Sequence, residues 1–163
     1  MSSNEELSRG LATRRIVIGL DSQGRSATVI EDQAPHVVFN TTYPGIASNT
    51  LWKEGRGIDL ESQDDHAVKW TEMAVPTDGT RFYLVTIGAG VEAGLHTTPT
   101  IEYHYVVSGA ITIVLEGEDI EARAGDVIVM RGVPHGWRND HDVPFVSAAV
   151  QVGMHTALGD GTH

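Results

Sequence analysis

The sequence predicts an all-β protein, folded as a sandwich or a barrel. Short runs rich in β-branched and aromatic residues arrive every 8 to 12 residues, and Gly, Asp, Asn or Pro separates them. No stretch carries a convincing apolar period of 3.6 residues, which an amphipathic helix would show. A chain of 163 residues is long enough to bury a real core and is expected to form one domain.

The N-terminal half gives the weaker strand signal. Residues 1–10 are polar and have no period, so we expect a mobile segment or an arm that contacts a partner subunit. Two β-branched runs at 15–20 and 26–30 flank a turn-forming segment and predict a hairpin. Strand-like segments follow at 36–40, 48–53 and 67–75. In the C-terminal half the predicted strands are 80–87, 101–107, 110–115, 120–123, 126–130, 136–138 and 144–152.

Composition excludes several classes of function. Eleven Lys and Arg stand against 22 Asp and Glu, and the net charge of −11 repels phosphate backbones and anionic lipids. We therefore expect no nucleic-acid partner and no membrane partner. The sequence has no run of 18 apolar residues and no recognisable signal peptide, so we expect a cytoplasmic protein. With no cysteine, the chain has neither disulfides nor thiolate chemistry.

Polar residues recur at fixed intervals between Gly90 and Asn139. The first block places a histidine, a threonine, a glutamate and a glycine after Gly90, and the second runs from a Gly-Asp pair to a Pro-His pair and an asparagine. In a strand, alternate side chains share a face, so Glu102 and His104 point to one side. Tyr103 and Tyr105 then point to the other side, where we expect a contact between sheets or subunits. The positions of the two blocks are Gly90, His96, Thr98, Glu102 and Gly109, then Gly125, Asp126, Gly132, Pro134, His135 and Asn139.

These blocks resemble the two motifs of the cupin superfamily, G-x5-H-x-H-x3-4-E-x6-G and G-x5-P-x-G-x2-H-x3-N. Together they cover about a third of the chain. Thr98 stands where the second histidine of the first motif is usual, and the interval from Gly125 to Gly132 is one residue shorter than the pattern. The amino-acid sequence across both motifs is also similar to that of small bacterial single-domain cupins.

The resemblance implies a fold and an assembly. The fold is a double-stranded β-helix, or jelly-roll, barrel at about 80–152, preceded by an N-terminal strand extension at about 13–79, within one domain that spans 1–163. Cupins commonly pair through their N-terminal strands, so we expect a homodimer.

The converging side chains predict a metal site. Neutral imidazoles and a carboxylate suit one divalent transition metal such as Fe, Mn, Zn or Ni. His96, Glu102 and His135 make a set of two histidines and one carboxylate with open positions. His104 either replaces, as a metal ligand, the histidine that is absent at Thr98, or it does not bind the metal. In the second case it contacts one of the metal-binding side chains or forms part of the cavity wall. The alternative for each histidine is a structural role in which it is held by hydrogen bonds.

Three further residues are candidates for the substrate pocket. Thr98 lies within the first motif. Trp137 shares a strand face with His135 and either closes the cavity or packs in the core. Arg131 either pairs with an anionic substrate or is a solvated charge at a strand end. A dinucleotide loop at Gly88–Gly94 is disfavoured because the chain does not continue into a helix, and no nucleophile-elbow motif supports a Ser-His-Asp triad.

The expected function is metal-dependent catalysis on a small oxygenated molecule. In one mechanism a Lewis-acid metal promotes decarboxylation, elimination or isomerisation, with His104 or Glu102 as the catalytic residue that moves a proton. In the alternative, Fe(II) binds substrate and O₂ and the enzyme is a dioxygenase that cleaves a C–C bond. A third hypothesis is a barrel that only binds a small ligand.

Overall fold

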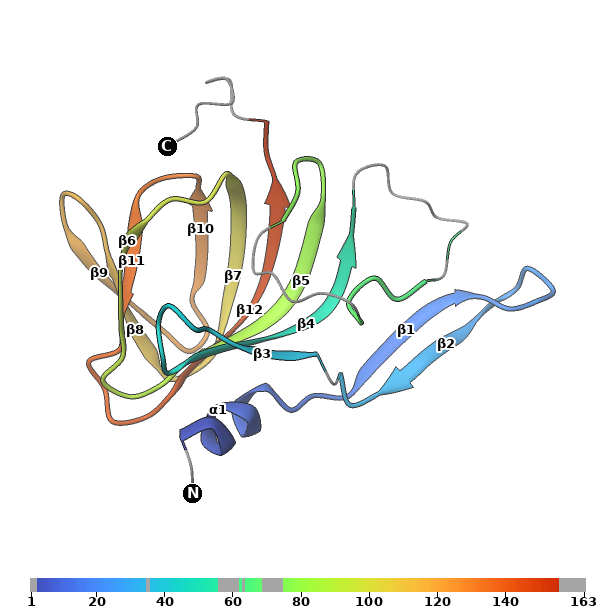
Figure 1. Ribbon diagram of the computed structural model, residues 1–163, viewed down its shortest axis with the longest axis horizontal. Helices are drawn as coiled ribbons and strands as arrows, with labels where there is room; N and C mark the ends of the chain where they lie inside the picture. The colour runs from blue at the N-terminus through green and yellow to red at the C-terminus, as the bar shows by residue number, and fades with distance from the viewer. Residues whose placement is uncertain (1–2, 35, 56–61, 63, 69–74, 156–163) are drawn as a thin grey trace.

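The computed structural model describes residues 3–34, 36–55, 62, 64–68 and 75–155. This part of the chain holds one short helix and twelve strands (Figure 1). Their bounds are α1 Ser3–Leu11, β1 Arg15–Leu20, β2 Ser26–Asp32, β3 Val37–Phe39, β4 Ile46–Glu54, β5 Thr80–Ile87, β6 Glu92–His96, β7 Thr100–Ser108, β8 Ala110–Val114, β9 Asp119–Arg123, β10 Val127–Arg131, β11 His135–Arg138 and β12 Phe145–Gly153. No helix of the described residues is long and apolar enough to cross a membrane.

Two antiparallel sheets form the barrel, which confirms the predicted jelly roll. The larger sheet has six strands in the order β10-β7-β12-β5-β4-β3, and the smaller has four in the order β6-β11-β8-β9 (Figure 1). The core lies between them, where Val106, Phe145 and Met130 of the larger sheet join Ile111 and Trp137 of the smaller. The strands β3 and β4, which fall in the predicted N-terminal extension, continue the six-stranded sheet.

Glycines close the tight turns that bring the motif residues together. Gly109 sits between β7 and β8 with a φ of 75°, and a Cβ there would lie 2.6 Å from the carbonyl oxygen of Pro144. Only a residue without a side chain fits this position, because both the conformation and the space exclude one. Asp126 caps the turn before β10 by accepting a hydrogen bond from the backbone N–H of Arg123 at 2.8 Å.

The N-terminal hairpin forms as predicted and projects away from the barrel (Figure 1). Its base is held by Arg15, whose side chain is buried. The guanidinium donates two hydrogen bonds to Asp32 and one to the carbonyl oxygen of Leu51 on β4, and it pairs with Asp65 at 2.7 Å. A bidentate pair fixes direction as well as distance, so Arg15 ties the hairpin to the larger sheet.

Other parts of the N-terminal half differ from prediction. Residues 3–11 form the helix α1 and not an aperiodic arm, because Leu7 and Leu11 lie one helical turn apart and both are buried against Ala47. A two-leucine stripe among polar residues is too short to show as a period in the sequence. The strand β6 is also absent from the predicted strands. Of the predicted strand at 67–75, Ala67 and Val68 lie in a turn and residues 69–74 fall outside the described residues.

The outer face of the larger sheet is apolar. Tyr103 and Tyr105 keep 45% and 53% of their surface exposed, and Val127 and Val129 on the neighbouring strand keep 70% and 52%. Strand pairing places Val129 beside Tyr103 and Val127 beside Tyr105, so the four side chains form one patch. The two tyrosines therefore point away from Glu102, as strand alternation predicted.

Candidate functional site

The predicted site residues meet in a cavity of about 310 Å³ that both sheets of the barrel line. The smaller sheet contributes residues from β6 and β11, and the larger sheet contributes residues from β5, β7 and β12. The predicted residues on its wall are His96, Thr98, Glu102, His104, His135 and Trp137. Arg131 is the exception, because it is exposed at the end of β10 and does not line the cavity. The structure thus places Arg131 outside the cavity in which the sequence analysis expected it.

His96 and His135 form a cross-strand pair at one side of the cavity. They are register partners on β6 and β11, and their ring centroids lie 4.5 Å apart. The Nδ1 of His96 lies 2.9 Å from the carbonyl oxygen of Gly94, and the Nδ1 of His135 lies 2.8 Å from that of Val133. A carbonyl oxygen only accepts, so each Nδ1 carries the hydrogen and each Nε2 keeps a lone pair. Burial lowers the pKa of His135, which favours this uncharged form.

Glu102 and His104 form a second pair on the opposite sheet. The Nε2 of His104 lies 3.2 Å from Oε2 of Glu102, and its Nδ1 lies 3.1 Å from the hydroxyl of Ser147. The hydroxyls of Thr98 and Thr100 lie 2.6 and 2.8 Å from Oε1 of Glu102. Burial raises the pKa of Glu102, but the hydrogen bonds from His104 and the two threonines outweigh it and lower the pKa to about 2.

This arrangement decides which nitrogens are available to a ligand. Because an ionised carboxylate only accepts, Nε2 of His104 carries a hydrogen and points it at Glu102. Its other nitrogen faces Ser147, so His104 has no lone pair directed into the cavity. Ser147 is fully buried and does not line the cavity, so the row of Ser147, His104 and Glu102 is no nucleophilic triad.

No group of three or more His, Asp and Glu side chains among the described residues is positioned to hold a metal ion. Glu102 and His104 are instead bonded to each other. In donor type the residues still fit a divalent transition metal, because two imidazoles present free Nε2 atoms beside a buried, ionised carboxylate.

Several cavity residues escaped the sequence analysis. Arg81 and Tyr83 on β5 are buried and line the cavity, and the guanidinium carbon of Arg81 lies 4.2 Å from the centroid of the Tyr83 ring. Arg81 also donates to the hydroxyls of Thr50 and Ser48. Burial lowers the pKa of Arg81 and raises that of Tyr83. The alternation of the predicted strand at 80–87 contained this signal, because Arg81 and Tyr83 share a face with the apolar Val85.

Trp137 fulfils both of its predicted alternatives. It belongs to the core cluster and also walls the cavity. Its ring centroid lies 5.5 Å from that of His104 and 5.9 Å from that of His135. The indole therefore lies close to one histidine of each polar pair, and it forms an apolar part of the cavity wall together with Phe145, whose ring centroid lies 6.2 Å away.

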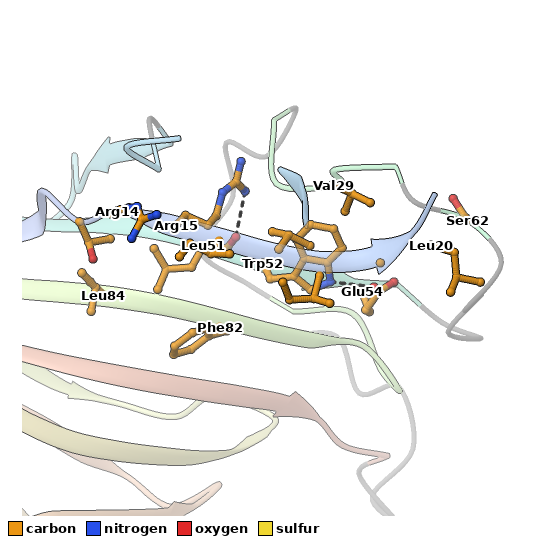
Figure 2. A pocket seen from close by; sticks show the side chains of 15 residues that line it. Arg14, Arg15, Leu20, Val29, Leu51, Trp52, Glu54, Ser62, Phe82 and Leu84 are labelled. Atoms are coloured by element: carbon orange, nitrogen blue, oxygen red, sulfur yellow. Dashed lines mark hydrogen bonds between the residues drawn. The ribbon is translucent and has the colours of Figure 1, made fainter. Parts of the chain in front are cut away.

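A larger hollow of about 680 Å³ lies outside the barrel, between the hairpin and strands β4 and β5 (Figure 2). Apolar side chains such as Ile18, Trp52 and Phe82 line it. Two of its polar groups are engaged in structural bonds, since Arg15 donates to the Leu51 carbonyl oxygen and the Trp52 indole donates to Glu54 (Figure 2). The smaller cavity is therefore the better candidate for chemistry.

Comparison with known proteins places this geometry in context. The sequence profile of the Cupin_2 cupin-domain family matches residues 83–150. A protein named cupin-domain-containing oxidoreductase srdD, from Neurospora crassa, is 31% identical over 129 residues, which are 77% of this chain and 65% of that protein. This chain thus spans slightly less than two thirds of that relative.

A second relative is covered more fully. Phomopsin biosynthesis cluster protein C′ from Diaporthe leptostromiformis is 30% identical over 152 residues, which are 85% of this chain and 76% of that protein. Both relatives are fungal, so they lend no support to the bacterial subgroup that the amino-acid sequence of the motifs suggested. Among solved structures, the cupin domain of Schizosaccharomyces pombe Cnp3 is similar in fold, with a TM-score of 0.53 at 12% identity, over 86% of this chain and 87% of that one.

Proposed function

Because this chain belongs to the cupin superfamily, we propose that its barrel cavity is the active site of a metal-dependent enzyme that acts on a small oxygenated organic molecule. One observation carries the proposal. Two imidazoles are locked by backbone carbonyls so that both free Nε2 atoms belong to one cavity, which also holds the ionised carboxylate of Glu102. The proposed reaction is a decarboxylation, an elimination or an isomerisation.

His96, His135 and Glu102 are the residues that we propose to hold a divalent transition metal. When bound, such an ion supplies a Lewis acid for a carbonyl or carboxylate oxygen. The backbone bonds on both Nδ1 atoms support this assignment, because metal-binding histidines commonly donate their second N–H to a carbonyl or carboxylate. For His104 the position favours contact with Glu102 over metal ligation.

Proton transfer is proposed for the pair of Glu102 and His104. The hydroxyl of Ser147 either donates to Nδ1 of His104 or accepts from it, so the imidazole is held in place with one hydrogen or with two. The pair can therefore take up or release a proton without rearrangement of its neighbours. Histidine and glutamate are the residue types most used for such transfer.

The cavity walls indicate the size and nature of the substrate. Ile46, Val85 and Phe145 present apolar surface, beside polar side chains such as Arg81, Glu102 and His135. A cavity of about 310 Å³ takes a small molecule with an apolar body and few polar atoms.

An oxidation is the second candidate, since the Neurospora relative is named an oxidoreductase. The same two imidazoles and carboxylate suit Fe(II) with open positions. A turnover assay distinguishes the oxidation from the reaction that needs no O₂. Its substrates are β-keto acids, hydroxy acids, enols and catechols, and each is assayed with Zn(II), Mn(II) and Fe(II), with and without O₂. We expect turnover without O₂. Oxygen uptake stoichiometric with substrate loss, and only with iron, establishes the oxidation instead, and no turnover in any form favours a binding protein.

The metal assignment is tested by elemental analysis of protein reconstituted without oxygen. We expect about one equivalent of Fe(II), Mn(II), Zn(II) or Ni(II) per chain. His96→Ala should abolish binding, His104→Ala should weaken it about 10- to 100-fold, and His155→Ala, at an exposed histidine outside the cavity, should leave it unchanged. Less than about 0.2 equivalents for every metal refutes the assignment.

A further inference from the structure

Three amide side chains are buried among the residues that the structure describes, and they differ in what they bond. Asn49, Asn139 and Gln151 are 1%, 0% and 7% exposed. A buried amide without partners costs free energy, so each one needs an explanation in the structure or in a ligand.

The two asparagines have structural roles through their Nδ2 atoms, although Oδ1 of Asn49 also has no hydrogen-bond partner among the described residues. Nδ2 of Asn49 donates to the carbonyl oxygens of Leu11 and Ala34, and so joins the end of α1 to the segment before β3. Asn139, which ends the second motif, donates from Nδ2 to the carbonyl oxygens of Ile87 and Val143. Both amides tie together segments that lie far apart in the sequence.

Gln151 lacks such a role. Its Oε1 is buried and has no hydrogen-bond partner among the described residues. Gln151 lines the cavity, while neither asparagine does. Strand pairing places it between Arg81 on β5 and Glu102 on β7, in one row on the inner face of the larger sheet. A buried acceptor without a partner, which stands in the candidate active site beside the proposed catalytic glutamate, is placed to bond a ligand.

We infer that Gln151 selects a substrate that carries a hydrogen-bond donor next to an acceptor. This inference rests on the proposed function only in taking the cavity as the substrate site. A primary amide offers one carbonyl acceptor beside an N–H donor, and it pairs in two bonds with a carboxamide, a lactam or a hydroxyl conjugated with a carbonyl. Such a ligand satisfies the buried Oε1.

The surroundings favour an uncharged group. Gln151 lies between two buried strand neighbours of opposite charge type, the guanidinium of Arg81 on β5 and the carboxyl group of Glu102 on β7, so neither an anion nor a cation is favoured there. The apolar side chains of Ile46, Val85 and Phe145 then cover the rest of the ligand.

The test compares three probes of similar size on metal-free protein. Benzamide carries a donor and an acceptor, acetophenone an acceptor alone, and toluene neither. By NMR titration we expect wild type to bind benzamide about tenfold tighter than toluene, with acetophenone between them. In Gln151→Met, which keeps the length of the side chain, the ratio of benzamide to toluene affinity should fall to about one.

Thermal unfolding without ligand supplies a second measurement. Removing an unpaired acceptor should raise the Tm of Gln151→Met by about 2 to 6 °C. The control Asn139→Leu removes a bonded amide and should lower the Tm. A drop in Tm for Gln151→Met like that of the control overturns the inference, and so does wild type that binds benzamide no better than toluene. Elemental analysis tests the metal assignment separately. Failure of that assignment therefore leaves the probe affinities and the Tm values as an independent test of Gln151.

Discussion

Glu102 should make the stability of the metal-free protein depend on pH in acid. Its pKa is about 2 in the folded chain against an ordinary value of 4.5. Between these two values the unfolded chain binds more protons than the folded one, so stability falls as the pH drops through the interval. Linkage gives a loss of about 2 kcal/mol from this group alone between about pH 6 and about pH 3.

The substitution Glu102→Gln removes this contribution and keeps a similar shape. At about pH 6 the variant should be the less stable protein, because the charged acceptor for Thr98, Thr100 and His104 is lost. At about pH 3 the difference from wild type should be smaller by about 2 kcal/mol. Other carboxylates and the buried His135 are present in both proteins, so the comparison isolates the one carboxylate.

Urea unfolding followed by tryptophan fluorescence measures this difference, since the chain has three tryptophans. Glu92→Gln serves as the control, because Glu92 is an exposed glutamate on β6 and its substitution should leave the pH dependence as in wild type. If the difference between wild type and Glu102→Gln stays constant within about 0.5 kcal/mol from about pH 6 to about pH 3, the hydrogen bonds do not hold Glu102 as a carboxylate.

Two further predictions concern the scaffold. Gly125→Ala should lower the free energy of unfolding by about 1 to 2 kcal/mol, because φ is 95° there but no atom lies within 4 Å of the new Cβ. Gly109→Ala should lower it by at least about 2 kcal/mol more, because the new Cβ meets a backbone oxygen at 2.6 Å. Equal losses in thermal or urea unfolding would contradict this assignment. We also predict a homodimer that covers the exposed patch of Tyr103, Tyr105 and Val127, so light scattering should give twice 17.6 kDa. The double substitution Tyr103→Glu and Tyr105→Glu should give a monomer, and a wild-type mass of 17.6 kDa refutes the dimer.

The sequence by itself determined the fold class and most of the candidate site. Strand alternation is a local property with a period of two residues, so it placed Glu102 and His104 on the inner face and the two tyrosines outside. Two turns are also set by local chemistry: Gly109 adopts a positive φ, and the side chain of Asp126 accepts a hydrogen bond from the backbone N–H of Arg123, three residues earlier. These features follow from a few neighbouring residues, which a single sequence displays.

The tertiary structure decided the partners of those residues. His104 meets Ser147, and Gln151 meets Glu102, through the register of β12 against β7, which joins residues more than forty positions apart. The burial of Arg81 depends on β4 and β5 in the same way. Local patterns set which face a side chain takes, but the register between distant strands sets which atoms it touches. For that reason the sequence identified the histidines, but only the tertiary structure distinguished His96 and His135, whose Nε2 atoms are free, from the bonded His104. It also revealed that the buried Oε1 of Gln151 has no partner among the described residues.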